Sequence, residues 1–132
     1  MAVVLDTCTW VWWCASPEKL SIPAREAIER EVPSGTLRLS MISVWEVAKL
    51  VQKRKLAFSI PCRQWIEQAL SQDGLQVCPL AAEICVDSTE LPGVFHGDPA
   101  DQIIVATARA LSAAIVTCDR KIRGYPHVAT LW

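Results

Sequence analysis

The stretch Ala2-Val3-Val4-Leu5-Asp6 is a short apolar run that ends on a carboxylate, and Ala114-Ile115-Val116-Thr117-Cys118-Asp119 repeats this arrangement near the other end of the chain. Short continuous apolar runs are typical of strands that are covered on both faces, as in parallel sheets. In an open α/β sheet, ligands bind outside the carboxyl ends of the strands. We therefore expect Asp6 and Asp119 at the edge of the sheet where such a protein does its chemistry.

Helix and strand signals alternate along the rest of the chain, without a linker or a repeat. Further strands are predicted at residues 37–41, 75–78 and 128–131, and helices are predicted to begin near Ser21, Ser43 and Ser59 and to span residues 81–91 and 98–111. Strands that are separated by helices require right-handed crossovers, which make the sheet mainly parallel. The sequence thus predicts one α/β domain, residues 1–132, with a mainly parallel sheet of four or five strands and helices on both faces.

The composition is rich in core-forming residues, with 52% hydrophobic side chains. No apolar stretch approaches the roughly 18 residues that cross a bilayer, and the first residues lack the features of a signal peptide. We therefore expect a cytoplasmic protein without a membrane contact.

Six cysteines are present, and four of them, Cys8, Cys78, Cys85 and Cys118, lie in apolar stretches. They are expected to be buried free thiols, because a reducing compartment and an adequate core make disulfides unnecessary. A zinc site is not expected, because no CxxC pair is present and the two histidines lie far from each other and from the cysteines.

Two further groups of acids stand where helices are predicted to begin. Ser43-Val44-Trp45-Glu46 opens one helix, and Asp98-Pro99-Ala100-Asp101 opens another. Both patterns also read as helix caps, with Ser43 and Glu46 forming a capping box and Asp98 acting as an N-cap. In a parallel sheet these acids lie at the same edge as the acids that follow the strands.

Asp6 and Asp119 have no evident capping role in the sequence, and each adjoins strongly apolar residues. Burying a lone carboxylate costs several kcal/mol unless it is paired or bound to a metal. Clusters of carboxylates suit a hard divalent cation such as Mg²⁺ or Mn²⁺, which prefers oxygen ligands. The joint pattern favours a metal site that hydrolyses a phosphodiester.

Positive charge is local in a chain whose net charge is −1. One cluster ends the helix that Glu46 begins and the other follows Asp119 directly; they consist of Lys49, Lys53, Arg54 and Lys55, and of Arg120, Lys121 and Arg123. Each cluster is either a solvated helix end or a set of contacts to nucleic-acid phosphates.

The chain resembles a known family, the PIN-domain ribonucleases, and among them the VapC-type toxins of bacterial toxin–antitoxin pairs. Four pieces carry the resemblance in the family's order, and together they span nearly the whole chain: residues 3–7, 42–48, 98–108 and 116–119.

The resemblance implies roles for particular residues. The catalytic and metal-binding acids would be Asp6, Glu46, Asp101 and Asp119, with Asp98 as an extra metal ligand or a helix cap. Thr7 and Thr117 match polar positions that could hold a metal-bound water or a substrate oxygen. Substrate contacts are also expected from the two basic clusters, in particular from Lys53, Arg54, Lys55, Arg120, Lys121 and Arg123. The implied cofactor is Mg²⁺ or Mn²⁺, and the implied partners are a cognate antitoxin, an RNA substrate and a second copy of the chain.

The expected function is therefore a metal-dependent endoribonuclease that is the toxin of a toxin–antitoxin pair. A PIN nuclease of RNA maturation is the nearest alternative. A non-catalytic dimeric binding module, whose acids only cap helices, is the alternative from another class, and it predicts no carboxylate cluster. The six tryptophans serve either core packing and a subunit interface or base stacking on single-stranded RNA.

Overall fold

The computed structural model describes all 132 residues and contains one five-stranded sheet in the order β3-β2-β1-β4-β5. The strands are β1 (Val3–Leu5), β2 (Leu37–Ser40), β3 (Leu75–Cys78), β4 (Ala114–Val116) and β5 (Thr130–Leu131). The helices are α1 (Thr7–Ala15), α2 (Ile22–Glu31), α3 (Ile42–Gln52), α4 (Cys62–Leu70), α5 (Ala82–Asp87), α6 (Pro99–Ala110) and α7 (Arg120–Arg123), with short 3₁₀ turns at Pro17–Lys19 and Val32–Ser34. All four strand pairings are parallel, which confirms the predicted class.

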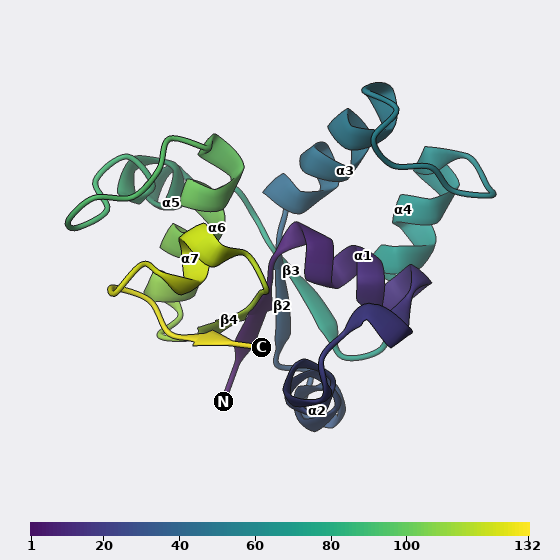
Figure 1. Ribbon diagram of the computed structural model, residues 1–132, viewed down its shortest axis with the longest axis horizontal. Helices are drawn as coiled ribbons and strands as arrows, with labels where there is room; N and C mark the ends of the chain where they lie inside the picture. The colour runs from purple at the N-terminus through teal and green to yellow at the C-terminus, as the bar shows by residue number, and fades with distance from the viewer.

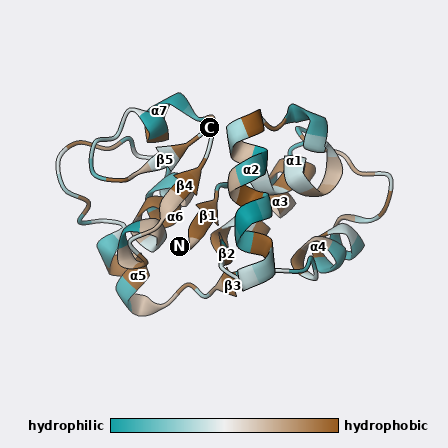
Figure 2. Cartoon of the chain, turned by 90° about the horizontal axis from the view of Figure 1, so that it is seen from below, coloured by the Kyte–Doolittle hydropathy of each residue, from teal (hydrophilic) through white to brown (hydrophobic).

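Alternate side chains of the central strands point to opposite faces of the sheet, and a separate core forms on each face. Val3 and Leu5 pack into a cluster with α1, α2, α3 and α4, whereas Val4 and Ile115 pack into a second cluster with α6. Figure 1 shows these helices on the two sides of the sheet. In Figure 2 the central strands are mostly hydrophobic, and α2 on the outside carries hydrophilic segments.

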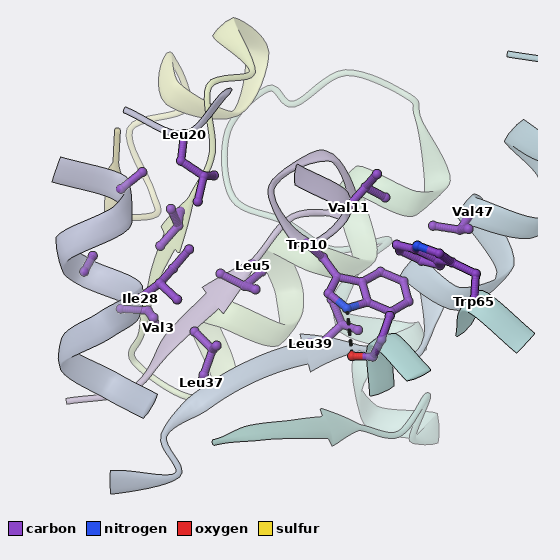
Figure 3. Close-up of a cluster of buried hydrophobic side chains, with 14 residues drawn as sticks. Val3, Leu5, Trp10, Val11, Leu20, Ile28, Leu37, Leu39, Val47 and Trp65 are labelled. Carbon is purple, nitrogen blue, oxygen red and sulfur yellow. Dashed lines mark hydrogen bonds between the residues drawn. The ribbon is translucent and has the colours of Figure 1, made fainter. Parts of the chain in front are cut away.

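Trp10 and Trp65 anchor the larger core where α1 meets α4 (Figure 3). Trp10 is fully buried, and its ring meets that of Trp65 edge-on with centroids 5.3 Å apart. The indole N–H donates to the carbonyl of Ala69 at 3.4 Å, so the one polar atom of the ring is satisfied. Core packing is thus the role of these two tryptophans, whereas Trp45 on α3 is 53% exposed.

Helix α1 was not expected from the sequence, because Thr, Val and Trp have weak intrinsic helix propensity and the segment lacks an amphipathic period. Asp6 caps this helix, and its carboxylate accepts the N–H of Thr9 at 2.8 Å. The cap and the burial of Trp10 and Val11 outweigh the weak propensity. Ser16 and Pro17, which resemble an N-cap and a first helical residue, begin only the short 3₁₀ turn, and Ser16 makes no side-chain cap bond there.

Several helices and strands are shorter than expected. Helix α5 ends at Asp87 rather than near Leu91, and β5 comprises two residues. All six cysteines are free, as expected, but the expectation that four are buried is wrong: Cys8 and Cys85 are exposed, and Cys78 and Cys118 are half-buried. None of the helices has both the length and the apolar character that a membrane span requires.

Helix α3 ends in a Schellman motif in which Arg54 adopts a left-handed conformation, with φ 58°. The N–H of Lys55 donates to the carbonyl of Leu50 at 2.9 Å, and the N–H of Arg54 donates to the carbonyl of Val51 at 3.0 Å. Glycine usually occupies this position, because a Cβ is unfavourable there. The left-handed conformation of Arg54 therefore lowers the stability of the protein, and it turns the chain sharply after α3.

We expect Arg54→Gly to raise the free energy of unfolding by about 0.5–1 kcal/mol, because the relief of the left-handed strain exceeds the added chain entropy of glycine. Ser112 ends α6 in the same conformation, with φ 50°, so Ser112→Gly is a matched control that removes no charge. Urea unfolding measures both changes. Destabilisation by both substitutions would contradict this account.

Candidate active site

Five carboxylates line one open cavity of about 540 Å³ at the carboxyl edge of the sheet. Asp6 directly follows β1, and Asp119 follows β4 three residues after its end. Glu46 lies on α3 after β2, and Asp98 and Asp101 lie at the start of α6. The parallel sheet thus gathers acids from four separate parts of the chain, as the positions of the strand ends predict.

Asp6 is held on both sides of its carboxylate. Oδ1 accepts the backbone N–H of Thr9, and Oδ2 accepts the hydroxyl of Thr117, 111 positions away in the sequence. Asp6 is only 5% exposed, and this burial raises its pKa, although the bonds from Thr117 and Thr9 oppose the rise. The expectation that Asp6 does not cap a helix is wrong, since the same carboxylate serves α1 and faces the cavity.

Asp119 also caps a helix, contrary to expectation. Its Oδ1 accepts the N–H groups of Lys121 and Ile122 at 2.8 and 3.1 Å. Its own N–H donates to the hydroxyl of Thr117 at 3.0 Å, and that hydroxyl donates onward to Asp6. Thr117 therefore couples the first acid of the chain to the last.

Glu46 is fixed by Thr7 rather than by a capping box. Helix α3 begins at Ile42, so Ser43 lies inside the helix and is fully buried, and the expected capping box is wrong. The hydroxyl of Thr7 donates to Oε1 of Glu46 and lies 2.8 Å from the hydroxyl of Ser43. Burial raises the pKa of Glu46, and the negative charges of Asp98, Asp6 and Asp119 add to the rise.

Asp98 and Asp101 form the tightest acidic group together with Glu46. One carboxylate oxygen from each of the three lies within 4.8 Å of the others. Asp98 also caps α6, because its Oδ1 accepts the N–H of Asp101 at 3.1 Å. Asp98 therefore caps α6, as one of its two expected roles requires, and its carboxylate also lies within reach of those of Glu46 and Asp101.

The expectation of a single four-acid cluster is met only in part. Asp6 and Asp119 line the same cavity but stand outside the group of three. Burial raises the pKa of Asp101 to about 7, and the charges of Asp98, Asp119, Glu46 and Asp6 contribute to the rise. Burial and mutual repulsion both disfavour the charged form of these carboxylates, and a bound cation would stabilise that form.

These residues fit a hard divalent cation. The donors are carboxylate oxygens at a spacing that one ion can bridge. Desolvation raises the pKa of the Cys8 thiol to about 12 and also raises that of Cys118, which disfavours the thiolate form that a soft metal binds. Mg²⁺ and Mn²⁺ match this donor set better than zinc does.

Two side chains at the site were missed by the sequence reasoning. Nε2 of His96 lies 3.1 Å from Oδ2 of Asp101, and Nδ1 accepts the N–H of Asp98 at 3.4 Å. The spacing His-x-Asp-Pro-x-Asp was the available signal. Lys19 lines the cavity from the 3₁₀ turn after α1, and it was missed because α1 was missed.

The two basic clusters lie differently with respect to the cavity. Lys53, Arg54 and Lys55 are all exposed at the end of α3, and of these three Lys55 lines the cavity. The other cluster forms the exposed surface of α7, next to Asp119; it consists of Arg120, Lys121 and Arg123. Thr7 and Thr117 are buried, and their hydroxyls hold Glu46 and Asp6.

We expect Asp98→Asn to leave the free energy of unfolding within about 0.5 kcal/mol of the original value, because Asn caps a helix as well as Asp does. Its affinity for Mn²⁺ should fall by about tenfold or more, because one charge of the three-acid group is lost. Calorimetric titration and urea unfolding measure the two effects. An unchanged Mn²⁺ affinity would reduce Asp98 to a helix cap.

Comparison with known proteins identifies the family to which this sequence is similar. The PIN domain model matches residues 3–128. Ribonuclease VapC22 of Mycobacterium tuberculosis (strain ATCC 25618 / H37Rv) is 33% identical over 132 residues, which are 98% of each chain.

Solved structures share the fold at lower sequence identity. VapBC2 from Rickettsia felis, bound to a DNA fragment from its promoter, matches with a TM-score of 0.71 and 20% identity over 98% of this chain and 97% of that chain. DNA-bound VapBC from Salmonella typhimurium matches with a TM-score of 0.70 and 16% identity over 98% and 96%. These structures share the fold, and the PIN domain match together with the 33% identity to ribonuclease VapC22 shows that the chain belongs to the PIN domain family and, within it, to the VapC group.

Proposed function

We propose that this protein is a divalent-metal-dependent endoribonuclease and the toxin of a toxin–antitoxin pair. The observation that carries the proposal is the gathering of five carboxylates in one cavity at the carboxyl edge of a parallel sheet. The 33% identity to a ribonuclease over 98% of the chain supports RNA as the substrate. Single-stranded or loop RNA is the expected form, because its backbone reaches an open cavity more readily than a paired helix does.

Glu46, Asp98 and Asp101 would hold the cation, with Asp6 and Asp119 beside them. A bound divalent cation supplies charge stabilisation at the phosphodiester and makes water a stronger nucleophile. Thr117 and Thr7 keep the carboxylates of Asp6 and Glu46 in fixed orientations. The protein thus provides a preorganised set of oxygens that needs little rearrangement during the reaction.

The ion is expected to be Mg²⁺ or Mn²⁺, and the protein is expected to act in the cytoplasm. The relatives from Rickettsia felis and Salmonella typhimurium were solved as VapBC complexes, so a cognate antitoxin is the expected protein partner. A homodimer is part of the same proposal. The exposed cations of α7, together with Lys53 and Arg54, would contact RNA phosphates outside the cavity.

The structure bears on one of the two alternative functions. A non-catalytic binding module predicts no carboxylate cluster, whereas Glu46, Asp98 and Asp101 form one. A PIN nuclease of RNA maturation would use the same site, and a neighbouring small gene that encodes an antitoxin would decide against it.

Incubation of the purified protein with a panel of structured RNAs tests the activity. We expect cleavage in single-stranded or loop segments with Mg²⁺ or Mn²⁺ and none with EDTA. Undiminished cleavage in EDTA would refute the metal dependence. The absence of cleavage with both ions, in protein that binds Mn²⁺ by calorimetry, would refute the ribonuclease.

A further inference from the structure

The cavity has a second half that the acids do not explain. Besides the five carboxylates, the cavity is lined by Thr7, Cys8 and Cys118 and by six apolar or basic residues, which form this second half: Val11, Trp12, Lys19, Leu50, Lys55 and Leu56. No acid lies among these six residues. A site built only to hold a metal ion would not require this extension.

Lys19 is held at the wall of this half by an aromatic ring. Its Nζ lies 5.9 Å from the ring centroid of Trp12, a cation–π arrangement. Trp12 is itself steadied by Trp132, with ring centroids 5.8 Å apart.

Lys55 reaches the same space from another part of the chain. The left-handed residue Arg54 reverses the chain after α3, and the N–H of Lys55 closes the Schellman turn on Leu50. This turn places Lys55 and Leu56 in the cavity lining. The strained conformation of Arg54 thus has a consequence at the site, since it brings a second cation, besides Lys19, to the cavity of the five carboxylates.

Neither Lys19 nor Lys55 forms an ion pair. The salt-bridge contacts of the structure join the N-terminal amino group of Met1 to Glu31 and the ring of His96 to Asp101, and neither involves a lysine. Two ammonium groups beside five carboxylates, but unpaired with them, are available to an anion that enters the cavity. The apolar side chains of Val11, Leu50 and Leu56 line the same cavity and offer contact to a sugar and a base.

We propose that Lys19 and Lys55 form a nucleotide subsite that binds the backbone phosphate next to the scissile bond of single-stranded RNA. Trp12 acts as a positioning residue, because it holds the ammonium group of Lys19 at the wall. The subsite draws the RNA to the acidic half, which would otherwise repel it. This inference rests on the proposed ribonuclease function.

The test compares Lys19→Gln and Lys55→Gln with Arg30→Gln. Arg30 is an exposed cation on α2, which ends where the chain approaches the start of β2, at the opposite edge of the sheet. Each lysine substitution should raise the KM for RNA by about tenfold with little change in kcat. Each should also reduce the slope of log KM against log salt by about 0.7, the value for one phosphate contact on a single strand. Arg30→Gln should change neither quantity.

Two measurements do not depend on turnover. In an Asp6→Asn background, where cleavage is expected to be abolished, the lysine substitutions should weaken the binding of fluorescein-labelled single-stranded RNA by about tenfold. Calorimetry should find the Mn²⁺ affinity nearly unchanged by them.

The role of Trp12 is tested by turnover. Trp12→Phe keeps an aromatic ring under Lys19, so its KM for RNA should be lower than that of Trp12→Leu.

The outcomes separate the subsite from the function. An unchanged KM and salt slope in both lysine variants, with cleavage still abolished by Asp101→Asn, would overturn the subsite and leave the ribonuclease standing. Cleavage that survives both EDTA and Asp101→Asn would overturn the metal-dependent function that is proposed for the acidic site. If the lysine variants lose affinity for the co-expressed antitoxin while their KM for RNA is unchanged, the lysines serve a protein partner and the RNA subsite is wrong.

Discussion

Asp6→Asn and Asp119→Asn are each expected to abolish RNA cleavage, with a loss of about 1000-fold or more in kcat/KM. Each substitution removes one negative charge from the cavity without changing the size of the side chain. Asn caps helices as well as Asp does, so α1 and α7 keep their N-caps. The loss would therefore report the chemistry of the site rather than unfolding.

The stability of these variants distinguishes a functional acid from a structural one. Burial raises the pKa of Asp6, which means that its charged form is disfavoured in the folded protein. Without metal, Asp6→Asn should therefore unfold at the same temperature or higher. Asp101→Asn should behave in the same way, because the pKa of Asp101 is raised to about 7.

Asp73→Asn is the matched control, because Asp73 is exposed in the turn before β3. It should keep both activity and stability. Thermal unfolding in EDTA and initial rates with Mg²⁺ measure the two properties. Wild-type rates in Asp6→Asn and Asp119→Asn would remove these acids from the mechanism.

In the absence of metal, the protein is expected to become less stable as the pH rises from about 5 to about 8. The pKa of Asp101 is about 7 in the folded chain against 3.8 as the ordinary value, so the folded state binds this proton more tightly than the unfolded state does. The resulting stabilisation is fully present below the ordinary pKa and is lost as the pH rises through the folded value. The raised pKa values of Glu46 and Asp6 act in the same direction.

A divalent ion should reverse this trend, because it binds the ionised carboxylates of the folded state. At 100 times its dissociation constant, Mg²⁺ would add about 2.7 kcal/mol to the free energy of unfolding. The gain should be larger at about pH 8 than at about pH 5, where protons compete for the same oxygens. Thermal unfolding at both pH values, in EDTA and in Mg²⁺, checks the prediction.

Asp101→Asn provides the control for this pH dependence. The variant should lose much of the pH trend in EDTA and most of the stabilisation by Mg²⁺. A wild-type pH trend in Asp101→Asn would place the responsible group elsewhere in the protein.

The sequence alone determined the parallel sheet and the edge at which the acids gather. Two apolar runs end on the acids Asp6 and Asp119, and the carboxyl ends of parallel strands share one edge whatever the side-chain details. Asp6 and Asp119 could therefore be placed together although they are 113 positions apart. The cap on α6 was also readable, since Asp98-Pro99 is a local signal.

Only the tertiary structure decided how those acids are used. Helix α1 forms because packing and the Asp6 cap outweigh weak local propensity, and with it come the capping role of Asp6, the Thr7–Glu46 bond and the position of Lys19. The close group of Glu46, Asp98 and Asp101 likewise depends on how α3 and α6 meet. These contacts join side chains that are dozens of positions apart, and their distances depend on helix packing, which no local pattern in the sequence encodes.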